Sequence, residues 1–325
     1  MKVNATAGAQ SRRRRDERAA PLVDAYRHRC DLALPPRRVG GGGTGGLRSH
    51  GCADRRARLP RSCVLTTALA GVLGQPGRVA AALPDDLQIL DIHRSTAFTF
   101  DVRGRMVHES APDQSTGRRF SFTGCRHGNL PVIRADVPEE VARELDRLVT
   151  LEQPLAGAEA EPVHLDAYRE LLDLDGPLQH YHGLLWVFQG PLSYESEEEL
   201  VWSGTIEGDR LLARLGEAMP SSLADKGFLA RDDLWEPWCL AVVDAQVASI
   251  AETVRTGPAG AEVGVDTAVG FRGHGLGAAA TAGWSRHPQL TNHTCFYSTG
   301  RDNSSSRRLT ERLDLRFLGS TFAVP

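Results

Sequence analysis

The stretch Phe271-Arg272-Gly273-His274-Gly275-Leu276-Gly277-Ala278-Ala279 sets three glycines between a predicted strand and a predicted helix. The strand is predicted by apolar or β-branched side chains at every second position, namely Val263, Val265, Thr267 and Val269. The helix is predicted by residues at helical spacing that end before Pro288, namely Leu276, Ala279, Ala280, Gly283 and Trp284. A turn from strand to helix directs several backbone N–H groups and the positive helix end at one spot. The stretch therefore predicts an anion site suited to a pyrophosphate.

Two common phosphate-binding patterns do not fit this stretch. A P-loop needs Gly-Lys-Ser or Gly-Lys-Thr after its glycines, and neither follows here. A Rossmann fingerprint, Gly-x-Gly-x-x-Gly, has its glycines at other offsets and lies in a βαβ unit near the start of a domain. The glycine-rich run at residues 40–46 follows no predicted strand, so we interpret it as a flexible linker.

The spacing Arg272-x-x-Gly275-x-Gly277 resembles the acyl-CoA loop of the GNAT N-acetyltransferase superfamily, where it is written Arg/Gln-x-x-Gly-x-Gly/Ala. The elements predicted around the loop also follow the order of the GNAT core from its second strand onward. They are two strands joined by a tight turn (238–244 and 246–254), the motif strand (261–269), the helix after the loop, a strand (294–298), a helix after Asn303 (307–313) and a last strand (316–324). The resemblance covers about residues 200–325.

This resemblance implies an α/β (α+β) fold, the GNAT acyl-CoA N-acyltransferase fold, with a central mixed, mostly antiparallel sheet flanked by helices. We divide the chain into a disordered basic leader (1–85), a smaller mixed α/β N-terminal lobe (86–198) and a GNAT N-acetyltransferase domain (199–325). One hypothesis is that the lobe is a degenerate copy of the same fold. It has no second cofactor loop, because residues 124–129 lack the Arg-x-x-Gly-x-Gly spacing.

Within the lobe, a hairpin is predicted over residues 97–109 and a helix after Pro138, which two acidic residues follow. Further elements are predicted as helices over 165–174, 205–215 and 221–227 and as strands over 184–188 and 199–202. His180 and His182 lie on one face of an extended segment and could form a metal-binding pair. The sequence shows no third ligand nearby, so we interpret both as surface or packing residues and predict no metal site.

The resemblance implies acetyl-CoA as co-substrate and assigns its contacts. Backbone groups of Thr267, Ala268 and Val269 would bind the pantetheine arm. The pyrophosphate would bind Arg272, Gly273, His274, Gly275, Leu276, Gly277 and Ala278. Asn303 matches an asparagine on the cofactor side of the family, but it fits equally well as a plain helix cap. Ser306, one turn into the same helix, is a further candidate contact.

Two carboxylates of the motif strand are candidates for the general base. Glu262 and Asp266 are four residues apart, so both project from one face, about 13 Å apart at the usual strand rise. The resemblance implies that Glu262, near the start of the strand, is the catalytic base, directly or through water. The alternative is that both carboxylates are solvated residues on a half-exposed face.

The general acid is less clearly marked. Many GNAT proteins carry a tyrosine seven residues after the asparagine, but the count from Asn303 ends on Thr310. Tyr297, on the preceding strand, is the nearest substitute, with a packing role as the alternative. The thiolate could also leave to water without an acid, because a thiol is itself a mild acid.

Charge is distributed unevenly along the 325 residues, whose net charge is −3. Residues 1–85 hold 16 Lys or Arg and 6 Asp or Glu, a balance of +10, and the remainder holds 22 and 35, a balance of −13. The leader could be a nucleic-acid arm or a nuclear-import signal, but its scarce apolar periodicity favours plain disorder. Residues 64–73 begin too late for a secretion signal, and no apolar run is long enough to span a bilayer.

The six cysteines are scattered without Cys-x-x-Cys spacing. This distribution argues against a zinc ribbon and favours free thiols in a reducing compartment. We therefore expect a cytoplasmic protein.

The sequence thus predicts an N-acetyltransferase that moves an acetyl group from acetyl-CoA to a primary amine of a small molecule or a peptide. The acidic balance of the folded part favours a cationic amine. The missing tyrosine keeps open a non-catalytic acyl-CoA-binding or sensing module. The expected partners are acetyl-CoA and the amine acceptor, without membrane or nucleic acid, and the choice between monomer and homodimer is open.

Overall fold

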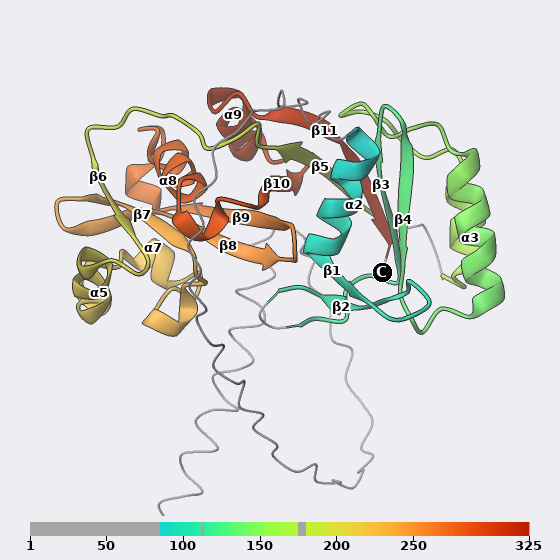
Figure 1. Cartoon of the computed structure of the whole chain (residues 1–325), viewed down its shortest axis with the longest axis horizontal. Helices are drawn as coiled ribbons and strands as arrows, with labels where there is room; N and C mark the ends of the chain where they lie inside the picture. The colour runs from blue at the N-terminus through green and yellow to red at the C-terminus, as the bar shows by residue number, and fades with distance from the viewer. Residues whose placement is uncertain (1–84, 112–113, 175–179, 325) are drawn as a thin grey trace, which may run out of the picture. The chain divides into compact units, whose positions relative to one another are not determined.

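The computed structural model describes residues 85–111, 114–174 and 180–324, which belong to one compact unit (Figure 1). The basic leader predicted for residues 1–85 lies outside the described residues except for Asp85, and so do the glycine-rich run at 40–46 and the segment 64–73. Their expected roles stay predictions. Among the described residues, no helix combines the length and the apolar character needed to cross a membrane.

Nine strands form one mixed sheet. Their order across the sheet is β4 (Gly128–Ile133), β3 (Phe120–Cys125), β11 (Arg316–Val324), β5 (Tyr181–Val187), β10 (Thr294–Gly300), β9 (Gly260–Thr267), β8 (Gln246–Thr256), β7 (Trp238–Val243) and β6 (Glu199–Trp202). Only β9 and β10 pair in parallel, and all other neighbours are antiparallel. The mixed, mostly antiparallel sheet implied by the resemblance is confirmed.

The remaining elements are a hairpin and a set of helices. The hairpin consists of β1 (Phe98–Phe100) and β2 (Met106–Glu109). The α-helices are α2 (Asp86–Ala97), α3 (Glu139–Leu151), α4 (Leu165–Leu171), α5 (Ile206–Ala213), α6 (Leu215–Ala218), α7 (Ser221–Ala224), α8 (Leu276–Ser285) and α9 (Ser304–Arg312). Three short 3₁₀ turns are η1 (Arg231–Asp233), η2 (Val269–Phe271) and η3 (Pro288–Leu290).

Helices cover both faces of the sheet. In β7, Cys239 packs in the cluster that contains α8, whereas the next residue, Leu240, packs against the helices α5 to α7. In β5, Trp186 likewise belongs to the cluster of α8, and Leu185 packs against α2. Because successive side chains of a strand point to opposite faces, α8 lies on one face and α2 with α5–α7 on the other. The central strands are therefore buried on both faces.

The predicted elements are confirmed, with ends shifted by a few residues. The helix predicted over 205–215 is interrupted at Arg214, which separates α5 from α6. One α-helix and two strands were missed, namely α2, β3 and β4, as were the short 3₁₀ turns. Asp85 and Gln88 form a capping box that starts α2, with the Gln88 N–H donating to the Asp85 carboxylate over 2.8 Å.

Strands from both predicted domains share the sheet. β5, from the predicted N-terminal lobe, pairs with β10 and with β11, which belong to the predicted acetyltransferase domain. β3 extends the same sheet by pairing with β11. The described residues thus form one continuous sheet across the predicted boundary at 198 and 199, and the division into two domains stays a prediction.

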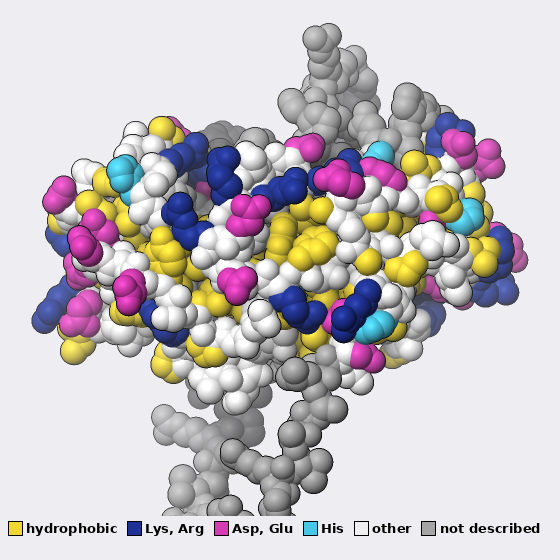
Figure 2. All heavy atoms as spheres, turned by 90° about the horizontal axis from the view of Figure 1, so that it is seen from above, with side chains coloured by type: hydrophobic (Ala, Val, Ile, Leu, Met, Phe, Trp, Pro, Cys, Tyr) yellow, Lys and Arg dark blue, Asp and Glu magenta, His cyan; other side chains and the backbone are white. Residues whose placement is uncertain are grey.

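Charged side chains of both signs are interspersed on the face of the described residues that Figure 2 shows, where Lys and Arg lie among Asp and Glu. Hydrophobic side chains lie between them. On this face, positive and negative side chains therefore lie close to one another.

Candidate active site

A cavity opens where two parallel strands separate. β9 and β10 pair only over Gly260–Glu262 and Thr294–Phe296. β9 continues to Thr267 and β10 to Gly300 without further pairing to each other. Residues of both unpaired stretches line a cavity of about 630 Å³, together with the glycine loop and α9. The separation of the strands is therefore what creates the site.

The predicted glycine loop forms one end of this cavity. After η2 the chain passes through Gly273 (φ 86°) and Gly275 (φ 82°), and α8 begins at Leu276. Both glycines adopt left-handed conformations that other residues rarely take. N–H groups in the first turn of a helix have no intrahelical acceptor, and Gly275 at the N-cap has no side chain to bind them. The loop can therefore offer backbone donors and the positive helix end to an anion.

Two of the loop glycines, Gly275 and Gly277, are also closely surrounded by side-chain atoms. A Cβ atom on Gly275 would lie 2.5 Å from the Tyr194 hydroxyl and 3.1 Å from Arg312 Nη1. A Cβ atom on Gly277 would lie 3.1 Å from Thr267 Oγ1, at the end of β9. A side chain at position 275 would thus collide with Tyr194.

Three of the arginines that line the cavity come from the loop and from α9. Arg272 comes from the loop and donates from Nε to the Thr267 carbonyl oxygen over 3.4 Å. Arg308 and Arg312 come from α9 and line the same cavity. Guanidinium groups bind phosphate oxygens in charge-assisted, often bidentate hydrogen bonds. Arg308 and Arg312 were not predicted as cofactor contacts from the sequence, although their spacing of four residues places them on one helical face.

Most of the predicted cofactor contacts line the cavity. They are Thr267, Arg272, Gly273, Gly275, Leu276, Gly277, Ala278, Asn303 and Ser306. Ala268, Val269 and His274 are not among the lining residues. The Ala268 N–H donates to the Ala248 carbonyl oxygen over 2.9 Å, and the Val269 N–H donates to Ser222 Oγ over 3.1 Å. These two amides are therefore engaged on the protein side.

Asn303 acts as the N-cap of α9. Its side-chain oxygen accepts from the Ser306 N–H over 3.0 Å, as expected for a cap. Both residues also line the cavity, so capping and cofactor contact are compatible at this position. Thr310 replaces the tyrosine of the family pattern, and its hydroxyl is buried and donates to the Arg307 carbonyl oxygen over 2.8 Å.

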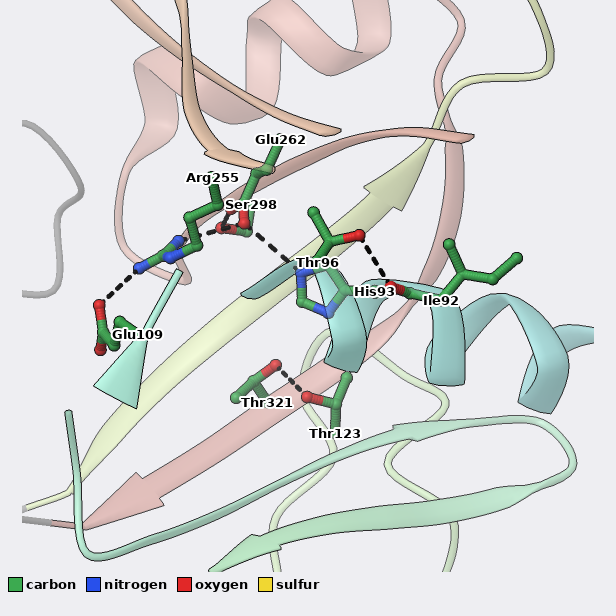
Figure 3. Close-up of polar contacts among 9 residues, drawn as sticks. All are labelled: Ile92, His93, Thr96, Glu109, Thr123, Arg255, Glu262, Ser298 and Thr321. Carbon is green, nitrogen blue, oxygen red and sulfur yellow. Dashed lines mark hydrogen bonds and ion pairs between the residues drawn. The ribbon is translucent and has the colours of Figure 1, made fainter. Parts of the chain in front are cut away.

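Glu262 lies in a buried polar network (Figure 3). Its side chain is 2% exposed, and Arg255 donates to Oε2 over 3.1 Å. His93 Nε2, from α2, lies 3.6 Å from the same oxygen, while the Ser298 hydroxyl donates to Oε1. Arg255 also bridges to Glu109 Oε2 over 3.3 Å. The solvated face considered as an alternative for Glu262 is thus wrong.

The network determines the protonation state of Glu262. Burial by itself would raise the pKa of this carboxyl group. The opposing Arg255 guanidinium, with His93 and Ser298, outweighs burial and holds the pKa of Glu262 well below its usual range. Glu262 is therefore ionised near neutral pH. The ionised carboxylate can accept a proton, but its lowered pKa makes it a weak base.

The other two candidate catalytic residues also line the cavity. Asp266 is largely buried and forms an ion pair with Lys226, which lies between α7 and η1. Tyr297 is buried on β10 and packs edge-on against Trp186, with ring centroids 6.4 Å apart. The structure thus brings Glu262, Asp266 and Tyr297 to one cavity.

Comparison with solved structures gives several matches at low sequence identity. A putative GNAT-family acetyltransferase from Novosphingobium aromaticivorans is 22% identical, with a TM-score of 0.34, over 45% of this chain and 64% of that chain. An acetyltransferase of the GNAT family from Colwellia psychrerythraea is 14% identical, with a TM-score of 0.35, over 74% of this chain and 96% of that chain. A tandem GNAT protein from the clavulanic acid biosynthesis pathway is 14% identical, with a TM-score of 0.34, over 61% and 78%.

The match to the Novosphingobium structure spans just under two thirds of that protein. Scans against protein-family models and against curated proteins give no match. The chain's own elements carry the likeness to the GNAT superfamily: a meander from β6 to β9, a glycine loop into α8, a parallel β10 and an asparagine-capped α9, in the order that the sequence predicted.

Proposed function

We propose that the protein is an N-acetyltransferase that moves an acetyl group from acetyl-CoA to a primary amine of a small molecule or peptide. The observation that carries this proposal is a glycine loop that enters α8 and lines a cavity between two separating parallel strands. Enzymes of other classes also use glycine loops. The proposal rests on the combination of the loop with a cavity lined by two separating parallel strands.

The residues present fit coenzyme A. The diphosphate would bind the amides of residues 273–278 with Arg272, Arg308 and Arg312 around it. The pantetheine arm would lie along β9 and β10 beyond their last paired residues, where the facing strand edges have no partner strand among the described residues. Amide groups of the arm could bond there as an added strand does. When bound, acetyl-CoA supplies the activated thioester.

Glu262 is our candidate for the base that receives the proton of the amine. The amine must lose a proton before or during attack, and the thiolate must leave. Because the Arg255 pair keeps Glu262 ionised, the rate should follow deprotonation of the amine itself and show no inflection from Glu262 near neutral pH. Tyr297 is the candidate acid for the departing thiolate. Asp266, paired with Lys226, is the alternative base.

One observation favours a second function. Glu262 is already engaged by Arg255 and Ser298, and Thr310 stands where a tyrosine acid is expected. A cavity that holds the cofactor without a strong base or acid would suit a non-catalytic acyl-CoA-binding or sensing module. The proposed cytoplasmic location and the choice between monomer and homodimer are predictions in either case.

Thiol release from acetyl-CoA, measured with a panel of primary amines, distinguishes the two functions. The matched variants are Glu262→Gln and the surface change Glu144→Gln, with acetyl-CoA affinity measured for each. If Glu262 is the base, Glu262→Gln lowers the turnover by about 10²–10⁴-fold at unchanged cofactor affinity. Binding without amine-stimulated release would establish the binding module, and absence of acetyl-CoA binding would refute both.

A further inference from the structure

Three potential metal ligands meet at the start of β5, away from the cavity described above. Glu161, His180 and His182 each place one ligand atom so that all three atoms lie within 4.8 Å of one another. His180 and His182 are two residues apart in an extended segment, so their side chains share one face. The sequence analysis considered this pair but found no third ligand. The structure supplies it in Glu161, from the segment between α3 and α4.

The imidazole of His182 is buried beside Glu161. The residue is 8% exposed, and neither ring nitrogen forms a hydrogen bond with any residue that the structure describes. Its Nδ1 atom lies 3.4 Å from Glu161 Oε2, which is an ion-pair distance. Burying a polar group without a hydrogen-bond partner costs free energy, and an ion bound at these nitrogens would remove that cost.

Glu161 is oriented as a metal ligand would be. Its Oε1 atom accepts from Arg301 Nη1 over 2.6 Å, which leaves Oε2 directed toward His182. The backbone of Arg301 is joined to β5, because its backbone N–H donates to the His182 carbonyl oxygen over 2.9 Å. Carboxylates that ligate a metal are commonly fixed by such an outer hydrogen bond. Glu161 is partly exposed, so an ion could reach the site from solvent.

We propose that Glu161, His180 and His182 bind a divalent transition-metal ion of the zinc type. Two imidazoles and one carboxylate suit Zn²⁺, with a fourth position for water, whereas Mg²⁺ and Ca²⁺ prefer oxygen ligands throughout. The ion would tie the segment that carries Glu161 to β5. Without the ion, Glu161 pairs with Arg301 and with His182.

A second group of possible ligands, Asp86, Cys125 and His127, is less suited to an ion. Both carboxylate oxygens of Asp86 are occupied by arginines, Oδ2 by Arg126 at 2.9 Å and Oδ1 by Arg316 at 2.8 Å. This second group therefore serves as an internal control.

The test uses the full chain, freed of metal with a chelator and titrated with Zn²⁺ by calorimetry and with Co²⁺ by absorption spectroscopy. The wild type should bind Co²⁺ with the visible d–d bands of a tetrahedral or five-coordinate ion. Glu161→Gln and His180→Ala should each lose this site and weaken Zn²⁺ binding there by about 100-fold or more, since even outer partners of a metal cost 10–100-fold.

Controls separate the site from other ligands in the chain. Glu159→Gln removes an exposed carboxylate two residues from Glu161, and His127→Ala removes a ligand of the second group. Both should bind as the wild type does. Equal affinity and stoichiometry in the wild type, Glu161→Gln and His180→Ala would overturn the proposal, as would a wild type without d–d bands. Circular dichroism verifies folding, and His180 is exposed, so its replacement should leave the fold intact.

Discussion

Replacing Arg255 with methionine should destabilise the protein strongly. Arg255 is 6% exposed and stands between two carboxylates, 3.1 Å from Glu262 and 3.3 Å from Glu109. Methionine fills similar space but leaves Glu262, 2% exposed, with an uncompensated charge. Breaking a buried ion pair by removing one partner costs about 3–5 kcal/mol. We expect a loss of this size in the free energy of unfolding near neutral pH.

The matched control is Arg147→Met. Arg147 pairs with Glu144 over 2.6 Å, but both residues are on the surface, where an ion pair contributes about 0–1 kcal/mol. The double variant Arg255→Met with Glu262→Gln removes the stranded charge as well. It should recover about 1–3 kcal/mol of the loss, because the two residues are in direct contact and their effects are not additive.

The loss should depend on pH in a defined direction. In the wild type the folded-state pKa of Glu262 is depressed, so its stabilisation is complete above the unfolded pKa and is lost as pH falls through the folded pKa. Without Arg255, burial should instead raise that pKa, and protonation then relieves the stranded charge. The difference between wild type and Arg255→Met should therefore be largest at about pH 7.5 and should shrink toward about pH 4.5.

Urea unfolding followed by circular dichroism measures these differences at both pH values. A loss for Arg255→Met below about 1 kcal/mol, comparable with Arg147→Met, would refute the buried-pair reasoning. A large loss that is the same at both pH values would show that packing, and not the charge of Glu262, is responsible.

Three further predictions concern the cavity and a thiol. Gly275→Ala should weaken acetyl-CoA binding in calorimetry, because an alanine is strained in this left-handed backbone and its methyl group would displace the Tyr194 hydroxyl. Gly270→Ala, with open space around it, should bind normally. Equal affinities of the two variants would place the phosphate site elsewhere. Arg308→Ala should weaken binding about tenfold and reduce its salt dependence, while Arg307→Ala, outside the cavity lining, should not. Burial raises the pKa of Cys239 to about 12, so alkylation at pH 8 should modify Cys239 only after unfolding. Peptide mapping that finds Cys239 rapidly labelled in the folded chain would contradict its buried position.

Local patterns were sufficient to predict the part of the site that is continuous in sequence. The alternation in residues 261–269 predicted β9, and the glycines that follow predicted the entry into α8. Asn303 was predicted as either a cofactor contact or a helix cap, and it caps α9. Each of these features depends on neighbours within about one turn or one strand, so the sequence displays it directly.

Contacts between distant segments could not be predicted in this way. Arg255 and Glu109 are 146 positions apart, and nothing in either segment indicates that β2 approaches β8. Glu161 was missed as a partner of His182 for the same reason. The failure to predict α2 is of another kind, because Asp85 and Gln88 form a recognisable capping-box pair that the analysis did not use.

The arrangement around Glu262 shows that the candidate site extends beyond the residues that resemble the GNAT core. His93 lies on α2 and Glu109 on β2, both N-terminal to the resemblance, and together with Arg255 they form the electrostatic environment of Glu262. β5, from the same part of the chain, separates β10 from β11 in the sheet. The strand that carries Tyr297 is thus held in place by residues outside the resemblance. Wherever the domain boundary is drawn, the chemistry proposed at Glu262 depends on the N-terminal segment, because that segment supplies charge and hydrogen-bonding groups around the carboxylate.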